Sequence, residues 1–244
     1  MTMKLYQFAI SHFSEKVRWA LDYKNLNYQP VFLLPGTHSK QIRRMAPGSS
    51  VPVLDHDGEI VQGSAEILDY LERHFPEKSL SGDDANSKAD ALAWQQRLDD
   101  EAGPAIRTWA YHYLLQRPKQ VAPMLTAQTP VYNRYLLRLG FSRVDEVMRD
   151  WMKINQKTAD KAQQTLDSLL EELDAAYQTS GYLVGGGFTL ADLTAASLLA
   201  PLFMPEKYPV PWPDTRRLPA PMKDWIAQKQ PKLARVAEIY RLHR

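Results

Sequence analysis

Two serines, Ser11 and Ser14, lie three residues apart in the stretch SHFSEKVRWAL, where a short apolar run ends and helical spacing begins. A serine at such a junction can cap the helix, because its side-chain oxygen accepts a hydrogen bond from a first-turn amide. The same helix end carries a partial positive charge that favours a bound anion. The pattern therefore leaves two roles open: capping alone, or contact with an anionic reaction centre.

Two other stretches have the residue types of a ligand site. In GSSVPVL, Pro52 stands where a strand begins and donates no ladder hydrogen bond. A cis Val51–Pro52 bond would leave the Val51 amide and carbonyl free for an extended, peptide-like ligand, and an ordinary trans proline is the structural alternative. In QGSAEILDYL, Ser64 lies in the first turn of a helix, whose free N–H groups suit a carboxylate. The alternative role of Ser64 is a plain N-cap.

The composition excludes several classes of reactive site and binding partner. The chain has 244 residues, a formal net charge of +2, no block of Lys and Arg, and no cysteine. Without cysteine there are no disulfides, thiolate metal sites or cysteine nucleophiles. The N-terminal stretch is too polar for a signal peptide, and no apolar run reaches the roughly 20 residues of a membrane span. We therefore expect a cytoplasmic protein whose partners include no nucleic acid, membrane or metal ion.

Short strands and helices alternate in the first part of the chain. Strand patterns cover 3–9, 28–34 and both sides of the Asp57-Gly58 turn, and helical patterns begin at Phe13, near His38 and at Ser64. The resulting order is βαβαββα. We expect a first domain over 1–76, a linker rich in Pro, Gly, Ser and Asp over 77–87, and a second domain over 88–244.

The second domain reads as all-helical. We expect one long helix over 89–115 with a kink at Gly103-Pro104, and an amphipathic helix over 158–177. In FTLADLTAASLLA, Thr189 and Asp192 have the spacing of a capping box at a helix start. The proline-rich stretch over 205–221 predicts irregular structure.

Taken together, these features resemble the glutathione S-transferase superfamily. SHFSEKVRWAL is similar to the family pattern SPxSxxVRxAL, VPVL is identical to its family counterpart, and GSAEILDYL is similar to ESxAIxxYL. FTLAD and its helical surroundings resemble the C-terminal domain of that family. The resemblance implies a thioredoxin-like N-terminal domain, an all-helical C-terminal domain, glutathione as co-substrate and a homodimer.

The resemblance places the catalytic hydroxyl at Ser11, with Ser14 as the alternative. The hydroxyl would donate a hydrogen bond to the sulfur of glutathione and favour the thiolate. A hydrogen bond to a charged group contributes roughly 1.5–3 kcal/mol, and a depression of two pKa units corresponds to about 2.7 kcal/mol. One hydroxyl therefore supplies most of what activation needs. His12 is expected to pack rather than to act as a base.

Other positions carry over as glutathione-binding residues. The Val51 backbone, beside a cis Pro52, would bind the cysteinyl part. Gly63 and Ser64 would hold the γ-glutamyl end at the helix N-terminus. His38 lies in a polar loop from which it can reach the glycyl carboxylate.

The electrophile pocket is expected on the late part of the first long helix, in the stretch RTWAYHYLL. Arg107 and Tyr113 are the candidates. The activated thiolate would attack a small hydrophobic electrophile or reduce a peroxide. The alternative is a non-catalytic binding or regulatory protein on the same scaffold, because a fold does not fix a function.

Three residues depart from the family pattern. Gly63 replaces an acidic or amide residue that contacts the γ-glutamyl amine, Ser50 replaces a lysine, and Glu66 replaces an alanine. Gln62 is expected to point to the other side. These departures favour weaker glutathione binding or a different thiol.

Overall fold

The computed structural model describes residues 2–82 and 84–244 and begins with a small domain of strands and helices. Met1 and Asp83, which belong to the expected first domain and linker, lie outside the described residues. The elements follow in the order β1 (Met3–Gln7), α1 (His12–Tyr23), β2 (Gln29–Phe32), α2 (His38–Ile42), β3 (Val53–His56), β4 (Glu59–Gln62) and α3 (Ser64–His74). The predicted βαβαββα order is therefore confirmed.

The four strands form one mixed sheet in the order β2-β1-β3-β4. β2 runs parallel to β1, whereas β3 runs antiparallel to β1, and β4 antiparallel to β3. The last residues of β1, β2 and β4 therefore lie at the same end of the sheet as the first residue of β3. Asp57 and Gly58, both with positive φ, form the turn between β3 and β4 at the opposite end.

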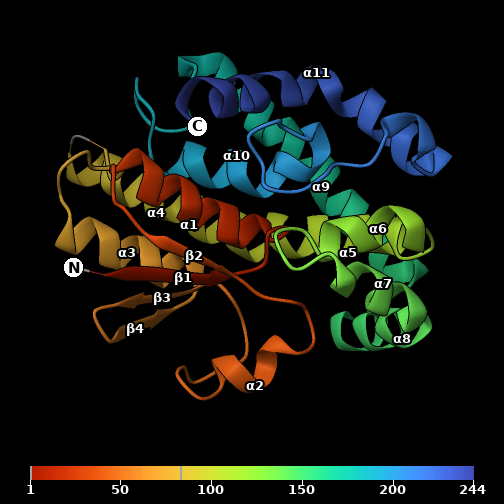
Figure 1. The fold of residues 1–244 in the computed structure, drawn as a ribbon. Coiled ribbons are helices and arrows are strands. Elements are labelled where there is room, and N and C mark those ends of the chain that lie inside the picture. Colours follow the sequence, from red (N-terminus) through yellow and green to blue (C-terminus); the bar gives the residue numbers. More distant parts are fainter. Residues whose placement is uncertain (1, 83) are drawn as a thin grey trace.

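Side chains alternate between the two faces of the sheet and pack under different helices. Leu5 and Leu54 belong to the main core, together with buried residues of α1 and α3. On the opposite face, Val53 packs in a smaller cluster with Leu33 and with Ile42 of α2. Helices α1 and α3 thus cover the face that is turned toward the second domain, and α2 covers the other (Figure 1).

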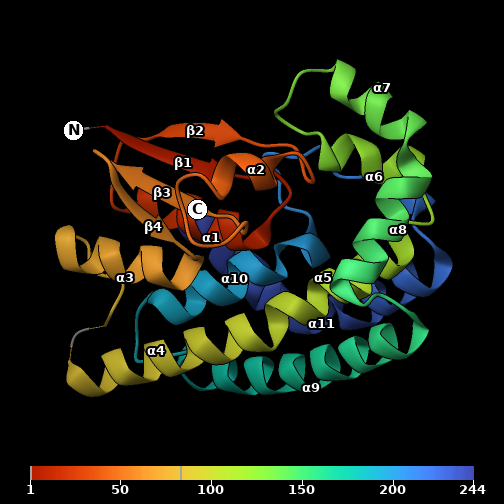
Figure 2. The same cartoon turned by 90° about the horizontal axis from the view of Figure 1, so that it is seen from below.

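The second domain is helical, as expected. Its elements are α4 (Ala85–Asp100), α5 (Ala102–Leu114), α6 (Pro118–Leu125), α7 (Tyr132–Leu139), α8 (Phe141–Met152), α9 (Gln156–Ser180), α10 (Leu190–Phe203), a short 3-10 helix (Thr215–Arg217) and α11 (Ala220–His243). Figure 2 shows α9 beside α4 and α5, and Arg97 of α4 forms an ion pair with Glu172 of α9. None of the helices in the described part of the chain is long and apolar enough to cross a membrane.

The prediction of a single helix over 89–115 is wrong, because α4 ends at Asp100 and α5 begins at Ala102, with Glu101 between them. Gly103 and Pro104, where a kink was expected, lie instead in the first turn of α5. Pro104 is tolerated there because the first amides of a helix have no intrahelical acceptor, so its missing N–H costs nothing. α4 also begins at Ala85, so the end of the expected linker is helical.

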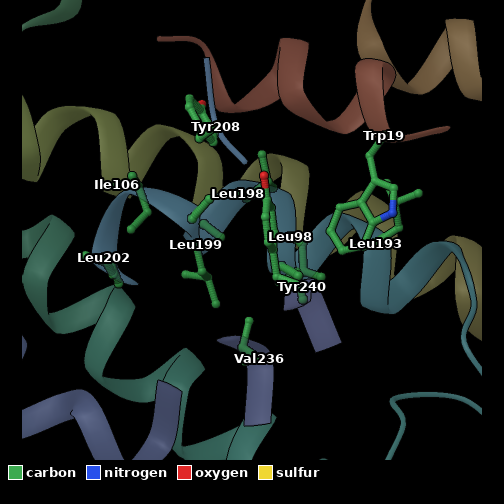
Figure 3. Close-up of a cluster of buried hydrophobic side chains, with 14 of the residues drawn as sticks. Trp19, Leu98, Ile106, Leu193, Leu198, Leu199, Leu202, Tyr208, Val236 and Tyr240 are labelled. Carbon is green, nitrogen blue, oxygen red and sulfur yellow. The ribbon is translucent and has the colours of Figure 1, made fainter. Parts of the chain in front are cut away.

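The core of the molecule is built around α10. Nearly every residue of this helix is buried, as expected for a helix that is apolar all round. Figure 3 shows Leu193, Leu198 and Leu199 of α10 in a cluster with Trp19 of α1 and Tyr240 of α11. Because α1 packs directly on α10, the start of α1 is held against the helical domain.

Candidate active site

One end of the sheet brings together the segments that carry the candidate residues. The connections that follow β1, β2 and β4 and the segment that enters β3 all meet there. They carry Ser11, His38, Ser64 and Val51, respectively. The topology therefore places the residues expected to bind glutathione at the same end of the sheet, next to the N-terminal end of α1.

Ser11 is the N-cap of α1 and is partly exposed. Its Oγ accepts a hydrogen bond from the Ser14 amide at 3.2 Å, and its own amide donates to the Phe8 carbonyl at 3.2 Å. The cap uses a lone pair of the oxygen, so the hydroxyl hydrogen stays available to a second acceptor. Ser11 thus presents a donor at the positive end of a helix.

Ser14 is fully buried in the first turn of α1. Its Oγ has no hydrogen-bond partner among the described residues. A hydroxyl that is shielded from solvent cannot reach a ligand without a change in the chain around it. Of the two serines, Ser11 is the accessible one.

The Val51–Pro52 peptide bond is cis. The ladder between β1 and β3 ends at Tyr6 opposite Val53, so Val51 lies beyond the sheet. The loop before it is held by Gln62, whose side chain accepts from the Gly48 amide at 2.9 Å and donates to the Ser50 carbonyl at 2.8 Å. Gln62 is thus a support for this loop.

Ser64 occupies the first position of α3, and Gly63 is the N-cap. Gly63 adopts a φ of +109° and has no side chain, so α3 begins without a side-chain cap. The first amides of α3 therefore lack the capping oxygen that a serine or aspartate would supply. Ser64 is not the cap itself, and a carboxylate bound there would meet these amides.

The carboxylate of Glu66 lies beside Gly63, a proximity that the sequence analysis did not predict. A Cβ built on Gly63 would lie only 2.0 Å from Glu66 Oε2, so the carboxylate fills the space of a side chain at position 63. Glu66 is itself exposed at the third position of α3. A carboxylate thus lies beside Gly63 although residue 63 has no side chain. The signal in the sequence was the pairing of the two departures, Gly63 and Glu66.

His38 is the first residue of α2 and packs edge-on against Phe8, with ring centroids 4.6 Å apart. Its Nδ1 accepts a hydrogen bond from the Gly36 amide at 3.1 Å. Burial lowers the pKa of His38, so the ring is neutral. It lies at the correct end of the sheet, and as a neutral donor it is a weaker partner for a carboxylate than a cation.

Helix α5 reaches the N-terminal end of α1 (Figure 1). A Cβ at Gly103 would lie 2.3 Å from the Phe13 ring, so the missing side chain lets this ring pack against the backbone of α5. Arg107, one turn further along α5, is close enough to His12 to lower the pKa of that histidine. Burial and this positive charge lower the pKa of His12 to about 3. His12 is therefore a neutral packing residue.

Tyr113, expected in the electrophile pocket, lies on another side of α5. Its ring packs edge-on against Trp109 at 5.6 Å, and the Trp109 indole donates to Gln163 of α9 at 3.1 Å. Six residues separate Tyr113 from Arg107, a rotation of about 240° around the helix. The structure therefore does not bring these two residues together.

Tyr111, and not Tyr113, lies near Arg107 on α5. Tyr111 follows Arg107 by one helical turn. Burial raises the pKa of Tyr111 to about 12, and the positive charge of Arg107 partly offsets this rise. The (i, i+4) spacing in the sequence was the signal for this pair. Tyr208 lies nearby and donates from its hydroxyl to the Ile10 carbonyl at 3.0 Å. No local pattern in the sequence indicated Tyr208.

Tyr208 also lines a cavity of about 410 Å³. The cavity is lined by residues of the segments 126–134 and 208–211, which belong to the helical domain. Within residues 2–82 and 84–244, no three His, Asp or Glu side chains are arranged to hold a metal ion.

Two family models match the chain. Residues 5–79 match the model described as "Glutathione S-transferase, N-terminal domain", and residues 146–220 match "Glutathione S-transferase, C-terminal domain". The two models together account for more than half of the 244 residues.

Individual proteins are similar over most of the chain. Protein LigF of Sphingobium sp. strain SYK-6 is 27% identical over 204 residues, which are 79% of this chain and 76% of that protein. Glutathione S-transferase TCHQD of Arabidopsis thaliana is 26% identical over 213 residues, 82% of this chain and 77% of that protein. A solved glutathione S-transferase of Methylobacterium radiotolerans, in complex with glutathione sulfonate, has a TM-score of 0.67 at 20% identity over 99% of this chain and 91% of its own. The last likeness shows a shared fold.

Proposed function

Because the chain belongs to the glutathione S-transferase superfamily, we propose that it is a glutathione transferase in which the Ser11 hydroxyl activates the thiol of glutathione. The activated thiolate attacks a small hydrophobic electrophile, or reduces a peroxide. The observation that carries this proposal is the geometry of Ser11, which caps α1 with its oxygen and keeps its hydrogen free.

The chemistry follows from that position. The thiol of glutathione has an ordinary pKa of about 8.5, so only a few per cent is thiolate at neutral pH. A hydrogen bond from Ser11 and the positive end of α1 both stabilise the thiolate and lower the thiol pKa. The thiol proton leaves to solvent, and sulfur forms a bond to carbon while the leaving group departs with the electron pair.

The other residues at this edge of the sheet hold the tripeptide. The free backbone of Val51, beside cis Pro52, pairs with the cysteinyl part, and the open amides at Ser64 receive the γ-glutamyl carboxylate. His38 is the candidate for the glycyl carboxylate. Glu66, whose carboxylate fills the space beside Gly63, faces the γ-glutamyl ammonium group. This placement offsets the absence of an acidic side chain at residue 63.

The test compares two single variants that remove one hydroxyl each. Conjugation of 1-chloro-2,4-dinitrobenzene with glutathione is measured for the protein and for Ser11→Ala and Ser14→Ala. We expect Ser11→Ala to lower kcat/KM by an order of magnitude or more, and Ser14→Ala to leave it within about threefold. Retention on immobilised glutathione without turnover by the unmodified protein would favour the non-catalytic alternative instead.

Two further properties are proposed from family membership. We propose that the protein is cytoplasmic and forms a homodimer. Sedimentation at micromolar concentration tests the dimer, and a species at the monomer mass of 27.9 kDa would contradict it.

A further inference from the structure

Arg107, near the candidate active site, forms no ion pair with a carboxylate of residues 2–82 or 84–244. It is half-buried, and its Nε is shielded from solvent with no hydrogen-bond partner among the described residues. Arginines elsewhere, such as Arg18, Arg97 and Arg244, pair with carboxylates at 2.5–2.7 Å. A guanidinium that has lost part of its water without gaining an anion is unfavourable, so it suits a bound anionic group.

Its neighbours on α5 place Arg107 near the beginning of α1. Gly103, one turn earlier on the same face of α5, meets the Phe13 ring. Arg107 itself acts on the charge of His12, the residue next to Ser11. Tyr111, one turn later, is partly buried and also lies near Arg107. Arg107 thus lies on the side of α5 that meets the beginning of α1, close to the residue that follows Ser11.

In the part of the chain that the structure describes, the titratable side chains that act on Arg107, His12 and Tyr111, carry no negative charge. His12 is neutral at ordinary pH and its Nε2 is buried without a partner in the described part of the chain. Tyr111 stays protonated because burial raises its pKa. A guanidinium flanked by a neutral imidazole and a phenol is suited to a planar carboxylate, which can accept two parallel hydrogen bonds from arginine.

We infer that the electrophile carries a carboxylate and that Arg107 binds it. This inference rests on the proposed glutathione transferase function and names its substrate class. Arg107 would pair with the carboxylate of the bound electrophile and orient the reacting carbon toward the thiolate at Ser11. A neutral electrophile could enter the same space, but it would leave the guanidinium without a partner.

The test uses a matched pair of electrophiles with the same leaving group. 4-Chloro-3,5-dinitrobenzoate has a carboxylate, and 1-chloro-2,4-dinitrobenzene does not. We expect Arg107→Gln to lower kcat/KM for the benzoate at least tenfold and for the neutral compound less than threefold, with partial rescue by Arg107→Lys. Arg117→Gln, an exposed arginine just beyond α5, removes the same charge and should change neither value.

An equilibrium measurement separates this inference from the proposed function. Calorimetry compares binding of S-benzylglutathione with binding of S-(4-carboxybenzyl)glutathione. We expect the unmodified protein to prefer the carboxylated conjugate about tenfold and Arg107→Gln to lose this preference. Equal affinities in the unmodified protein would overturn the inference while leaving glutathione binding intact. Failure to bind either conjugate would overturn both.

Discussion

At the scale of single residues, Ser11 can cap α1 and hold a thiolate at the same time. The cap uses the oxygen as an acceptor for the Ser14 amide, and the thiolate would use the hydroxyl hydrogen. The two roles therefore do not compete. The pattern SxxS by itself could not separate Ser11 from Ser14, because both lie on the first turn. The burial of Ser14 separates them, and burial depends on tertiary packing that a local pattern does not contain.

His12 makes the stability of the protein depend on pH. Its pKa is about 3 in the folded state and 6.5 ordinarily, so between these values the unfolded chain binds a proton that the folded protein does not. The free energy of unfolding therefore falls as pH falls from 6.5 toward 3. When the pH is lowered from 7 to 5, we expect the free energy of unfolding to fall less in His12→Asn than in the unmodified protein. Urea denaturation at several pH values measures this difference, and parallel curves would contradict it.

Glu66 should act on glutathione affinity through its charge. We expect Glu66→Gln to raise the KM for glutathione several-fold, because the γ-glutamyl ammonium loses its nearest carboxylate, and to leave kcat within about twofold. The matched control is Asp69→Asn, which removes an exposed charge that pairs with Arg73 on the same helix. A glutathione analogue without the amino group should bind both forms of residue 66 equally. Equal loss of affinity for glutathione and the analogue would contradict this role.

At the scale of elements, the start of α10 is fixed by a buried carboxylate. Asp192 accepts hydrogen bonds from the Leu183 amide at 2.9 Å and from the Thr189 amide at 3.0 Å. We expect Asp192→Ala to lower the free energy of unfolding by about 2–4 kcal/mol, since two buried amides lose their acceptor. Asp84→Ala, which removes an exposed cap from α4, should cost clearly less. Chemical denaturation compares the two, and equal losses would contradict the importance of burial.

The order of elements could be predicted because each local signal was strong. Alternation marked the strands, Asp57 and Gly58 marked the hairpin, and the spacing of Thr189 and Asp192 marked the start of α10. The break between α4 and α5 could not be placed in the same way. Pro104 is compatible both with a kink inside one helix and with the first turn of a new one. Packing of α5 against Phe13 of α1, a contact between domains, distinguishes these cases.

At the scale of the whole molecule, hydrogen bonds and an ion pair connect α11 and Arg244 to α1. Glu15 is buried and accepts from the Tyr240 hydroxyl at 2.6 Å, from Arg18 Nε at 2.7 Å and from Arg244 Nε at 2.7 Å. The carboxylate thus joins α11 and the last residue to the helix that presents Ser11.

Removing this carboxylate should destabilise both domains together. We expect Glu15→Ala to lower the free energy of unfolding by about 3–5 kcal/mol, because buried guanidinium groups lose their counter-charge. Asp22→Ala, which removes a more exposed partner of Arg244, should cost about 1 kcal/mol or less. Thermal denaturation followed by circular dichroism compares them. Similar losses in both variants would show that the buried carboxylate has no special role.

The two halves of the candidate site differed in how far the sequence could predict them. Ser11, Val51 and Ser64 could be proposed from the sequence because each belongs to a local pattern at a strand or helix end. The proposed electrophile side depends on how α5 is rotated. That rotation places Tyr111, and not Tyr113, on the face of α5 that carries Arg107, and packing between the domains brings Tyr208 to the Ile10 carbonyl.

The pKa of the thiol of bound glutathione tests the proposed role of Ser11 most directly. Thiolate absorbance of the complex is followed against pH for the unmodified protein, Ser11→Ala and the control Ser14→Ala. We expect a bound thiol pKa at least one unit below its ordinary value of about 8.5, unchanged in Ser14→Ala and raised by about one to two units in Ser11→Ala. The same pKa in Ser11→Ala, with glutathione still bound, would contradict the proposal that this hydroxyl activates the thiol.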